Sequence, residues 1–76
     1  MIYYRQNRLT KQLFRHVDGV SEEFIPKDRE WRSTGAAVEA FYDSSDSKAI
    51  SERDAIEIME RQARAAARGI RYADRP

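Results

Sequence analysis

The sequence predicts an α+β fold, in which a small antiparallel β-meander of two to four short strands over residues 2–32 packs on two C-terminal helices, over about 35–43 and 52–68. Three observations carry this prediction. Aromatic and β-branched residues are concentrated in the first part of the chain, an Asp-Gly pair separates two such runs, and apolar residues recur at helical spacing in the last third. A chain of 76 residues is expected to form one small domain, with residues 70–76 as a frayed tail.

The expected strands lie over residues 2–6, 12–17, 20–25 and 30–32. The pair Asp18-Gly19 accepts the positive φ angles of a type I′ turn, so it predicts a two-residue hairpin between the second and third strands. Pro26 ends the third strand, because proline lacks the N–H group that a sheet ladder needs. The fourth segment is short enough to be only the stub of a strand.

The first helix, over about 35–43, is expected to be capped by Ser33 or Thr34. Its apolar side chains recur at i, i+3 and i+4 and form a single face, made of Val38, Phe41 and Tyr42.

Residues 44–48 contain no apolar side chain and are expected to form a polar loop. Ile50 is the expected buried anchor after this loop. Ser51, with Asp54 three residues later, resembles a capping box and predicts the start of the second helix.

The second helix is expected to bury an apolar seam at spacings of three and four residues, made of Ile56, Met59, Ala63, Ala66, Ile70 and Ala73. Two acid-first pairs, Glu57–Arg61 and Glu60–Arg64, are expected on its exposed side. Gly69 either ends this helix in the left-handed conformation or lies inside a longer one, and we favour the end.

These elements predict one core, in which Trp31 anchors the meander to the second helix. Its expected members are Leu13, Phe24, Trp31, Phe41, Ile50, Ile56 and Met59. Because so thin a core gives little stability, we also expect a weak homodimer that uses the helix seam.

Composition excludes several classes of site. The chain has no Cys and one His, which excludes disulfides, thiolate zinc sites and multi-histidine metal sites. The few large apolar residues leave no room for a cofactor pocket and a substrate cleft, so we expect no cofactor, no metal and no small-molecule substrate. No apolar run approaches the roughly 20 residues of a membrane span, and no signal-peptide pattern opens the chain, so the expected location is the cytoplasm.

No constellation of residues predicts an enzyme. The single histidine, His16, is expected on a strand surface, and the neighbours Glu22 and Glu23 point to opposite faces of a strand. Glu57 and Glu60 each have an Arg four residues later and are expected to form solvated ion pairs rather than an acid–base dyad.

Two further patterns are weak. The stretch 43–54 resembles a calcium loop but has Lys48 where glycine is needed. The segment 32–35, Arg-Ser-Thr-Gly, could hold an anion at a helix start, although Ser and Thr are common there simply as caps.

The charges of the chain are segregated. The formal net charge is +1, but residues 1–17 carry a net +4, residues 18–60 a net −7 and residues 61–76 a net +4. Such basic ends either neutralise the acidic middle or face an anionic partner.

One arginine stripe, with spacings of three and four residues, is the primary candidate for partner binding: Arg61, Arg64, Arg68 and Arg71, continued by Arg75. It lies roughly opposite the expected apolar seam. A secondary patch on the first strands interleaves aromatic and cationic residues, namely Tyr3, Arg5, Arg8 and Arg15, in a pattern found in single-strand binders.

The sequence therefore predicts a small non-catalytic protein-interaction module, such as an adaptor, a regulator or a phage-type inhibitor. Its expected partner is another protein or a second copy of the chain, bound through segregated basic and acidic surfaces. The alternative is a nucleic-acid-binding module that uses the Arg-rich helix, but the pI of about 8.1 is low for that class.

Overall fold

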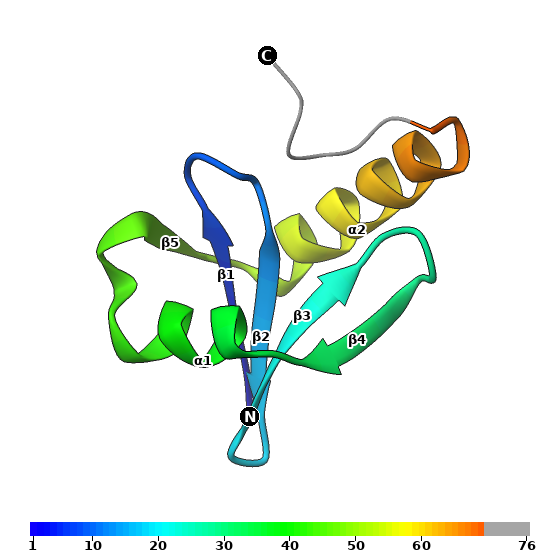
Figure 1. The fold of residues 1–76 in the computed structure, drawn as a ribbon. Coiled ribbons are helices and arrows are strands. Elements are labelled where there is room, and N and C mark those ends of the chain that lie inside the picture. Colours follow the sequence, from blue (N-terminus) through cyan, green and yellow to red (C-terminus); the bar gives the residue numbers. More distant parts are fainter. Residues whose placement is uncertain (70–76) are drawn as a thin grey trace.

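Figure 1 shows the computed structural model of the chain, which describes residues 1–69. Five antiparallel strands form one sheet in the order β4-β3-β2-β1-β5. The strands are β1 (Ile2–Asn7), β2 (Leu13–Val17), β3 (Val20–Ile25), β4 (Glu30–Ser33) and β5 (Ser47–Ile50). The helices are α1 (Gly35–Tyr42) and α2 (Glu52–Ala67), with a short 3-10 turn at Ser44–Asp46. The predicted α+β class is confirmed, and the meander, expected to have two to four strands, has four, to which β5 adds a fifth at the edge.

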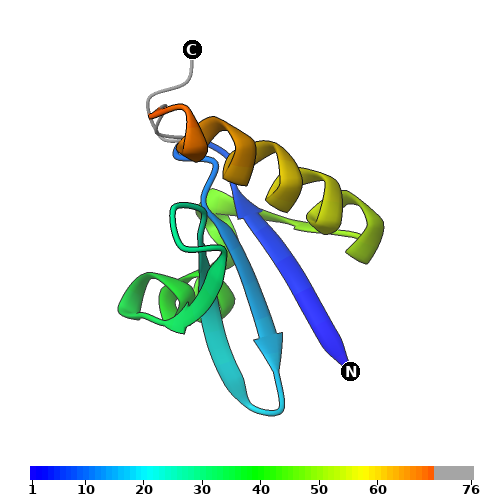
Figure 2. The same ribbon diagram turned by 90° about the vertical axis from the view of Figure 1, so that its right-hand side faces the viewer.

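The two helices cover opposite faces of the sheet, α1 on one and α2 on the other (Figures 1 and 2). Leu13 and Phe14 show why, since successive side chains of a strand point to opposite faces. Leu13 packs with residues of α2, and Phe14 packs with residues of α1. The single predicted core is therefore two cores, separated by the sheet.

The core on the α2 face forms around Leu13, Phe24, Ala55 and Ala63. Partly buried side chains pack against it: Tyr4, Trp31, Ile50, Ile58 and Met59. The prediction that Ile56 belongs to the core is wrong, because its side chain is 52% exposed. The helix places Ala55 and Ala63 against the sheet, with Ile58 and Met59 beside them, and this orientation turns Ile56 outward.

The core on the α1 face is smaller and contains Phe14, Ala37 and Ala40, with Phe41 packed against it. Of the predicted apolar face of the first helix, only Phe41 contacts this core. Val38 and Tyr42 are exposed, Tyr42 at 88%. The alanines again occupy the contact with the sheet.

Local turn and cap signals were predicted correctly. Asp18 (φ 51°) and Gly19 (φ 79°) both have positive φ angles, and Val17 pairs with Val20 across the turn. Thr34 caps α1, where its side chain accepts a hydrogen bond from the Ala37 N–H. Ser51 caps α2 in the same way.

Helix α2 ends at Ala67, with Arg68 as its C-cap, and Gly69 follows with a φ angle of 79°. Gly69 therefore takes the left-handed conformation that ends a helix. The predicted tail at 70–76 and the predicted seam residues Ile70 and Ala73 lie outside the described residues.

Strand β5 is the element that differs most from the prediction, because Ser47 and Lys48 were expected in a loop. It pairs with β1 in the register Tyr4 to Ile50 and Gln6 to Lys48. Arg5 on β1 fixes its start, with Nε donating to Ser47 Oγ (2.7 Å) and Nη2 to Ser47 O (2.8 Å). Tertiary contacts thus override a weak strand propensity.

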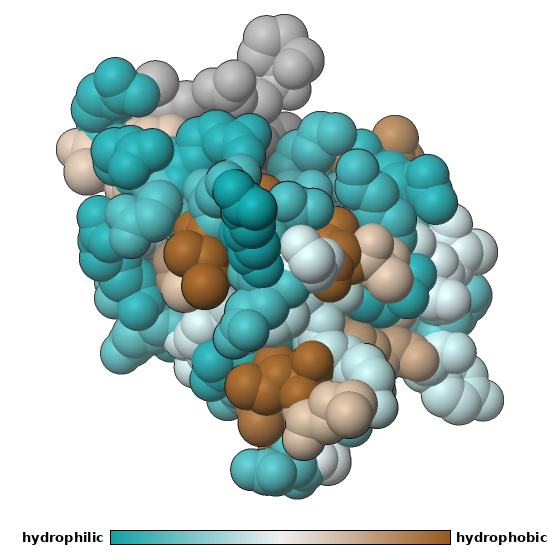
Figure 3. Space-filling view, turned by 180° about the vertical axis from the view of Figure 1, so that it is seen from behind, coloured by the Kyte–Doolittle hydropathy of each residue, from teal (hydrophilic) through white to brown (hydrophobic). Residues whose placement is uncertain are grey.

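Helix α2 crosses only part of its sheet face. Ile2 and Val20 both neighbour Val17 in the strand register and are 43% and 44% exposed. Figure 3, seen from behind, shows hydrophobic surface at the lower end of the molecule, near the β2–β3 hairpin. Neither helix within residues 1–69 has the length and apolar character needed to cross a membrane.

Candidate partner-binding groove

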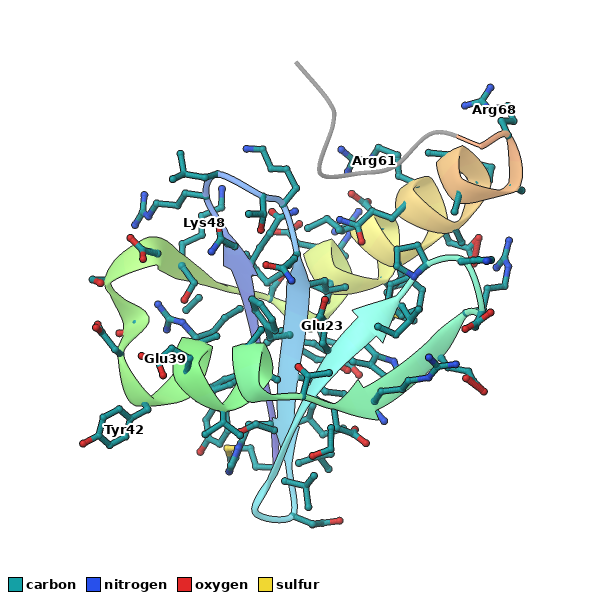
Figure 4. The ribbon with its side chains drawn as sticks, in the orientation of Figure 1. Glu23, Glu39, Tyr42, Lys48, Arg61 and Arg68 are labelled. Atoms are coloured by element: carbon teal, nitrogen blue, oxygen red, sulfur yellow. The ribbon has the colours of Figure 1, made fainter. Side chains whose placement is uncertain are left out.

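A groove of about 420 Å³ lies between α2 and the side of the sheet formed by β1 and β5. Four cationic side chains from three separate segments line it: Lys11 from the β1–β2 turn, Lys48 from β5, and Arg61 and Arg68 from α2. Figure 4 shows Lys48, Arg61 and Arg68 at the same end of the molecule as the β1–β2 turn. No cation of the four has a carboxylate within 4.0 Å among residues 1–69.

The helix supplies one wall of the groove through residues on a single side. Arg61 and Arg68 are seven residues apart, close to two helical turns, so both side chains leave the same side of α2. Ala65 lies between them on this wall, and its small side chain leaves space between the two guanidinium groups.

The opposite wall comes from β1, β5 and the turn that follows β1. Gln6 and Lys48 are register partners and both line the groove. Lys11 has a φ angle of 68°, which is uncommon for a residue with a side chain. Its carbonyl oxygen accepts hydrogen bonds from two side-chain amides, from Gln6 Nε2 at 3.2 Å and from Gln62 Nε2 at 2.7 Å.

Gln62 is a polar residue buried at this site, with only 7% of its surface exposed. Because Lys11 O can only accept a hydrogen bond, the orientation of the Gln62 amide is fixed. Its Oε1 atom is buried and has no hydrogen-bond partner within the described part of the chain. A buried acceptor without a partner costs about 1–3 kcal/mol.

The end of the groove nearest the start of α2 is acidic. Asp54 and Glu57 line the same wall as Arg61, and Ile50 and Ile58 provide apolar surface nearby. The sign of the charge therefore changes along the helix between residues 57 and 61.

The predicted arginine stripe is divided by the structure. Arg61 and Arg68 line the groove, whereas Arg64 Nη1 lies 3.8 Å from Glu60 Oε2, which is also 3.9 Å from Arg29 Nη1. Arg64 is thus turned toward the β3–β4 turn. The predicted pair Glu60–Arg64 is confirmed, and the predicted pair Glu57–Arg61 is wrong, because within residues 1–69 it forms no ion pair within 4.0 Å.

Arg71, the last predicted residue of the stripe, lies outside the described residues. Met59 and Ala63 of the predicted dimer seam face the sheet core, whereas Ile56 of the same seam is exposed.

The predicted secondary patch does not form one surface. Tyr3 and Arg5 alternate with Tyr4 and therefore lie on the α1 face, while Arg15 lies on the α2 face. Arg15 Nε donates to Glu22 Oε1 at 2.7 Å, and its guanidinium carbon lies 4.4 Å from the Trp31 ring centroid. Arg5 is bound to β5, and Arg8 is exposed in the β1–β2 turn.

Two weaker candidates from the sequence, His16 and the helix start at Thr34, make contacts within the fold. His16 Nδ1 lies 2.9 Å from Ser21 Oγ, and its ring packs 5.4 Å from the Phe41 ring. Glu23 Oε1 accepts a hydrogen bond from Thr34 Oγ1 at 3.0 Å, so a carboxylate of the chain itself lies beside the N-cap of α1.

Arg32 is likewise occupied by acids of its own chain. Its Nη2 atom donates to Asp28 Oδ2 at 2.6 Å and Glu30 Oε2 at 2.9 Å. The hydrogen bond and negative charge of Glu30, followed by the charge of Asp28, raise the pKa of Arg32. Residues 1–69 contain no cluster of three His, Cys, Asp or Glu residues that could hold a metal ion.

Sequence reasoning missed Lys48 and Gln62, and it grouped Lys11 with the cations of the first strands rather than with α2. Lys48 was assigned to a polar loop, and Lys11 is separated from Gln62 by 51 positions. A polar residue at position 62, three residues after Met59 and four before Ala66, was the one available signal. The chain matches no protein-family model, no curated protein and no solved structure.

Proposed function

We propose that the protein is a small non-catalytic binding module, and that the groove beside α2 holds an acidic segment of a partner protein. The observation that carries this proposal is the convergence of Lys11, Lys48, Arg61 and Arg68 on one groove without ion-pair partners among residues 1–69. Cations brought together from distant segments repel one another, and an anionic ligand relieves that repulsion.

The acids that line the groove favour a protein over a nucleic acid. Besides its cations, the groove presents the carboxylates of Asp54 and Glu57. A phosphate backbone carries negative charge along its whole length, so it would be repelled by these two acids.

The structural use of the candidate acid–base residues supports the non-catalytic part of the proposal. His16 is hydrogen-bonded to Ser21 and packed on Phe41, and Glu23 is hydrogen-bonded to Thr34 and Gln12. Nucleic acid remains the second candidate class, because Arg61 and Arg68 on one helix side also suit phosphates.

The test is a fluorescence anisotropy titration at about 0.15 M salt, with a labelled oligoglutamate peptide, a single-stranded oligonucleotide and a DNA duplex as probes. We expect the peptide to bind and the nucleic acids to bind negligibly. R61Q/R68Q should weaken peptide binding about tenfold or more, since two charge contacts are lost.

The matched control is R53Q/R64Q, which removes two exposed arginines of the same helix that do not line the groove. It should bind the peptide like the unmodified protein. Equal losses in both variants would mean that net charge, rather than the groove, attracts the peptide. Tighter binding of an oligonucleotide than of the peptide would replace this proposal with the nucleic-acid alternative.

A further inference from the structure

We infer that the segment held in the groove is bipolar: its acidic residues lie between Lys11, Arg61 and Arg68, and a basic residue of the same segment lies against Asp54 and Glu57. This inference rests on the proposed function and specifies the partner's charge pattern. It also predicts that this segment is extended.

The length of the groove fits a short extended peptide. Asp54 and Arg68 mark the two ends of the helical wall, and a rise of 1.5 Å per residue places them about 21 Å apart along the axis. An extended chain advances about 3.3 Å per residue, so about six residues cover this length. A segment of that size can reach the acidic and the basic ends together.

The acidic end of the groove is not explained by the helix alone. Asp54 lies in the first turn of α2, where a negative charge is stabilised by the helix dipole. Glu57 lies beyond the first turn, where the dipole effect has faded, and its expected partner Arg61 is not within ion-pair distance among residues 1–69. Two neighbouring carboxylates that line a groove favour a cation of the occupant.

The basic end is held in place by the fold. The hydrogen bond from the Gln62 side-chain amide to Lys11 O attaches the β1–β2 turn to α2, and a second one from Gln6 holds the same carbonyl from β1. Lys48 is fixed by its register with Gln6. The cations therefore occupy defined positions rather than a mobile loop surface, and their order relative to Asp54 and Glu57 is built into the structure.

Gln62 lies on the groove wall between the acidic and the basic ends of α2. An occupant that spans both ends crosses this residue. An anion that binds only at the basic end does not reach Asp54 and Glu57.

The test compares three labelled peptides of equal length with blocked termini. One has a block of Glu followed by a block of Lys, the second has the same residues in alternation, and the third has Glu only. We expect the block peptide to bind about five- to tenfold tighter than the alternating one, since the same charges are then placed in complementary order.

The double variant D54N/E57Q separates the inference from the proposed function. It should abolish the advantage of the block peptide and strengthen binding of the Glu-only peptide, because the repulsion at the acidic end is removed. The control E52Q/E60Q changes two exposed acids of α2 that do not line the groove and should leave both preferences intact.

If the Glu-only peptide binds as tightly as the block peptide and D54N/E57Q changes neither affinity, the bipolar inference is wrong while the acidic-segment function stands. If none of the three peptides binds, both are wrong. Circular dichroism of each variant shows whether a loss of binding reflects unfolding, and variants with an unchanged melting temperature decide the result.

Discussion

The carbonyl oxygen of Lys11 accepts a 2.7 Å hydrogen bond from the side chain of Gln62, which joins the β1–β2 turn to the middle of α2 across 51 sequence positions. This contact determines where the basic turn lies relative to the arginines of the helix. It also explains why a glutamine is buried among the alanines of α2. The groove is therefore a product of the same contact that fixes the helix on the sheet.

Replacing Gln62 with Ala should lower the free energy of unfolding by about 1–2 kcal/mol, because Lys11 O loses its shorter hydrogen bond. The loss is moderated by removal of the unpaired Oε1 atom. Gln6→Ala is the control, since its bond to Lys11 O is longer and exposed, and it should cost less than about 0.5 kcal/mol. Urea denaturation measures both, and equal costs would contradict the central role of Gln62.

Lys11→Gly should stabilise the fold while it weakens binding. Lys11 has a φ angle of 68°, and glycine adopts this conformation without steric cost, so we expect a gain of about 0.5–1 kcal/mol. The oligoglutamate peptide should bind several-fold more weakly, because one cation of the groove is lost.

Arg29→Gly is the matched control for this variant. Arg29 also has a positive φ angle, 53°, but it does not line the groove. It should show a similar gain in denaturation and no change in peptide affinity. Loss of affinity in both variants would assign binding to overall charge.

The orientation of α2 predicts opposite results for two adjacent residues. Ala55 is fully buried against the sheet, and Ile56 is exposed. Ala55→Gln should therefore cost more than about 2 kcal/mol through overpacking and burial of a polar group, whereas Ile56→Gln should stay within about 0.5 kcal/mol. Thermal melting followed by circular dichroism measures the two losses of stability. A larger loss for Ile56→Gln than for Ala55→Gln would support the buried Ile56 that the sequence predicts.

Local chemistry explains which parts of the fold could be predicted. Asp18-Gly19 specifies a hairpin because its positive φ angles suit few other residue pairs, and Ser51 and Thr34 specify helix starts through single hydrogen bonds to nearby N–H groups. These signals require only a few neighbouring residues.

The features that could not be predicted depend on distant partners. Strand β5 exists because Arg5 binds Ser47 and β1 offers a free edge, and neither is visible in the segment itself. Ile56 is turned to solvent because α2 packs Ala55, Ile58, Met59 and Ala63 against the sheet, and its backbone cannot present Ile56 on that side as well. Lys11, Lys48 and Arg61 line one groove only because β5 pairs with β1 and α2 lies in this orientation.

The two cores on opposite faces should respond differently to adjacent substitutions. Leu13→Ala and Phe14→Ala each remove a fully buried side chain and should cost about 2–5 and 3–5 kcal/mol. Trp31, the single tryptophan, packs on the Leu13 side only. In variants that remain folded, Leu13→Ala should shift Trp31 emission and Phe14→Ala should not. A shift of equal size in both would contradict the separation by the sheet.

Arg5 is expected to be a structural residue rather than part of a binding patch, and Arg5→Lys tests this assignment. The guanidinium group contacts the Ser47 hydroxyl and carbonyl through two nitrogen atoms, at 2.7 Å and 2.8 Å, and Nη2 also lies 3.4 Å from Ser44 O. An ammonium group keeps the charge but cannot reproduce this planar arrangement.

Arg5→Lys should therefore cost about 1–2 kcal/mol and accelerate amide hydrogen exchange in β5 more than in β2 or β3. Because the charge is retained and Arg5 does not line the groove, the affinity for the acidic peptide should change less than in R61Q/R68Q. Arg8→Lys is the control, since Arg8 is exposed in the β1–β2 turn and should affect neither quantity. Unchanged exchange in β5 would mean that pairing with β1 alone holds this strand, and Arg5 would then be free to serve a partner.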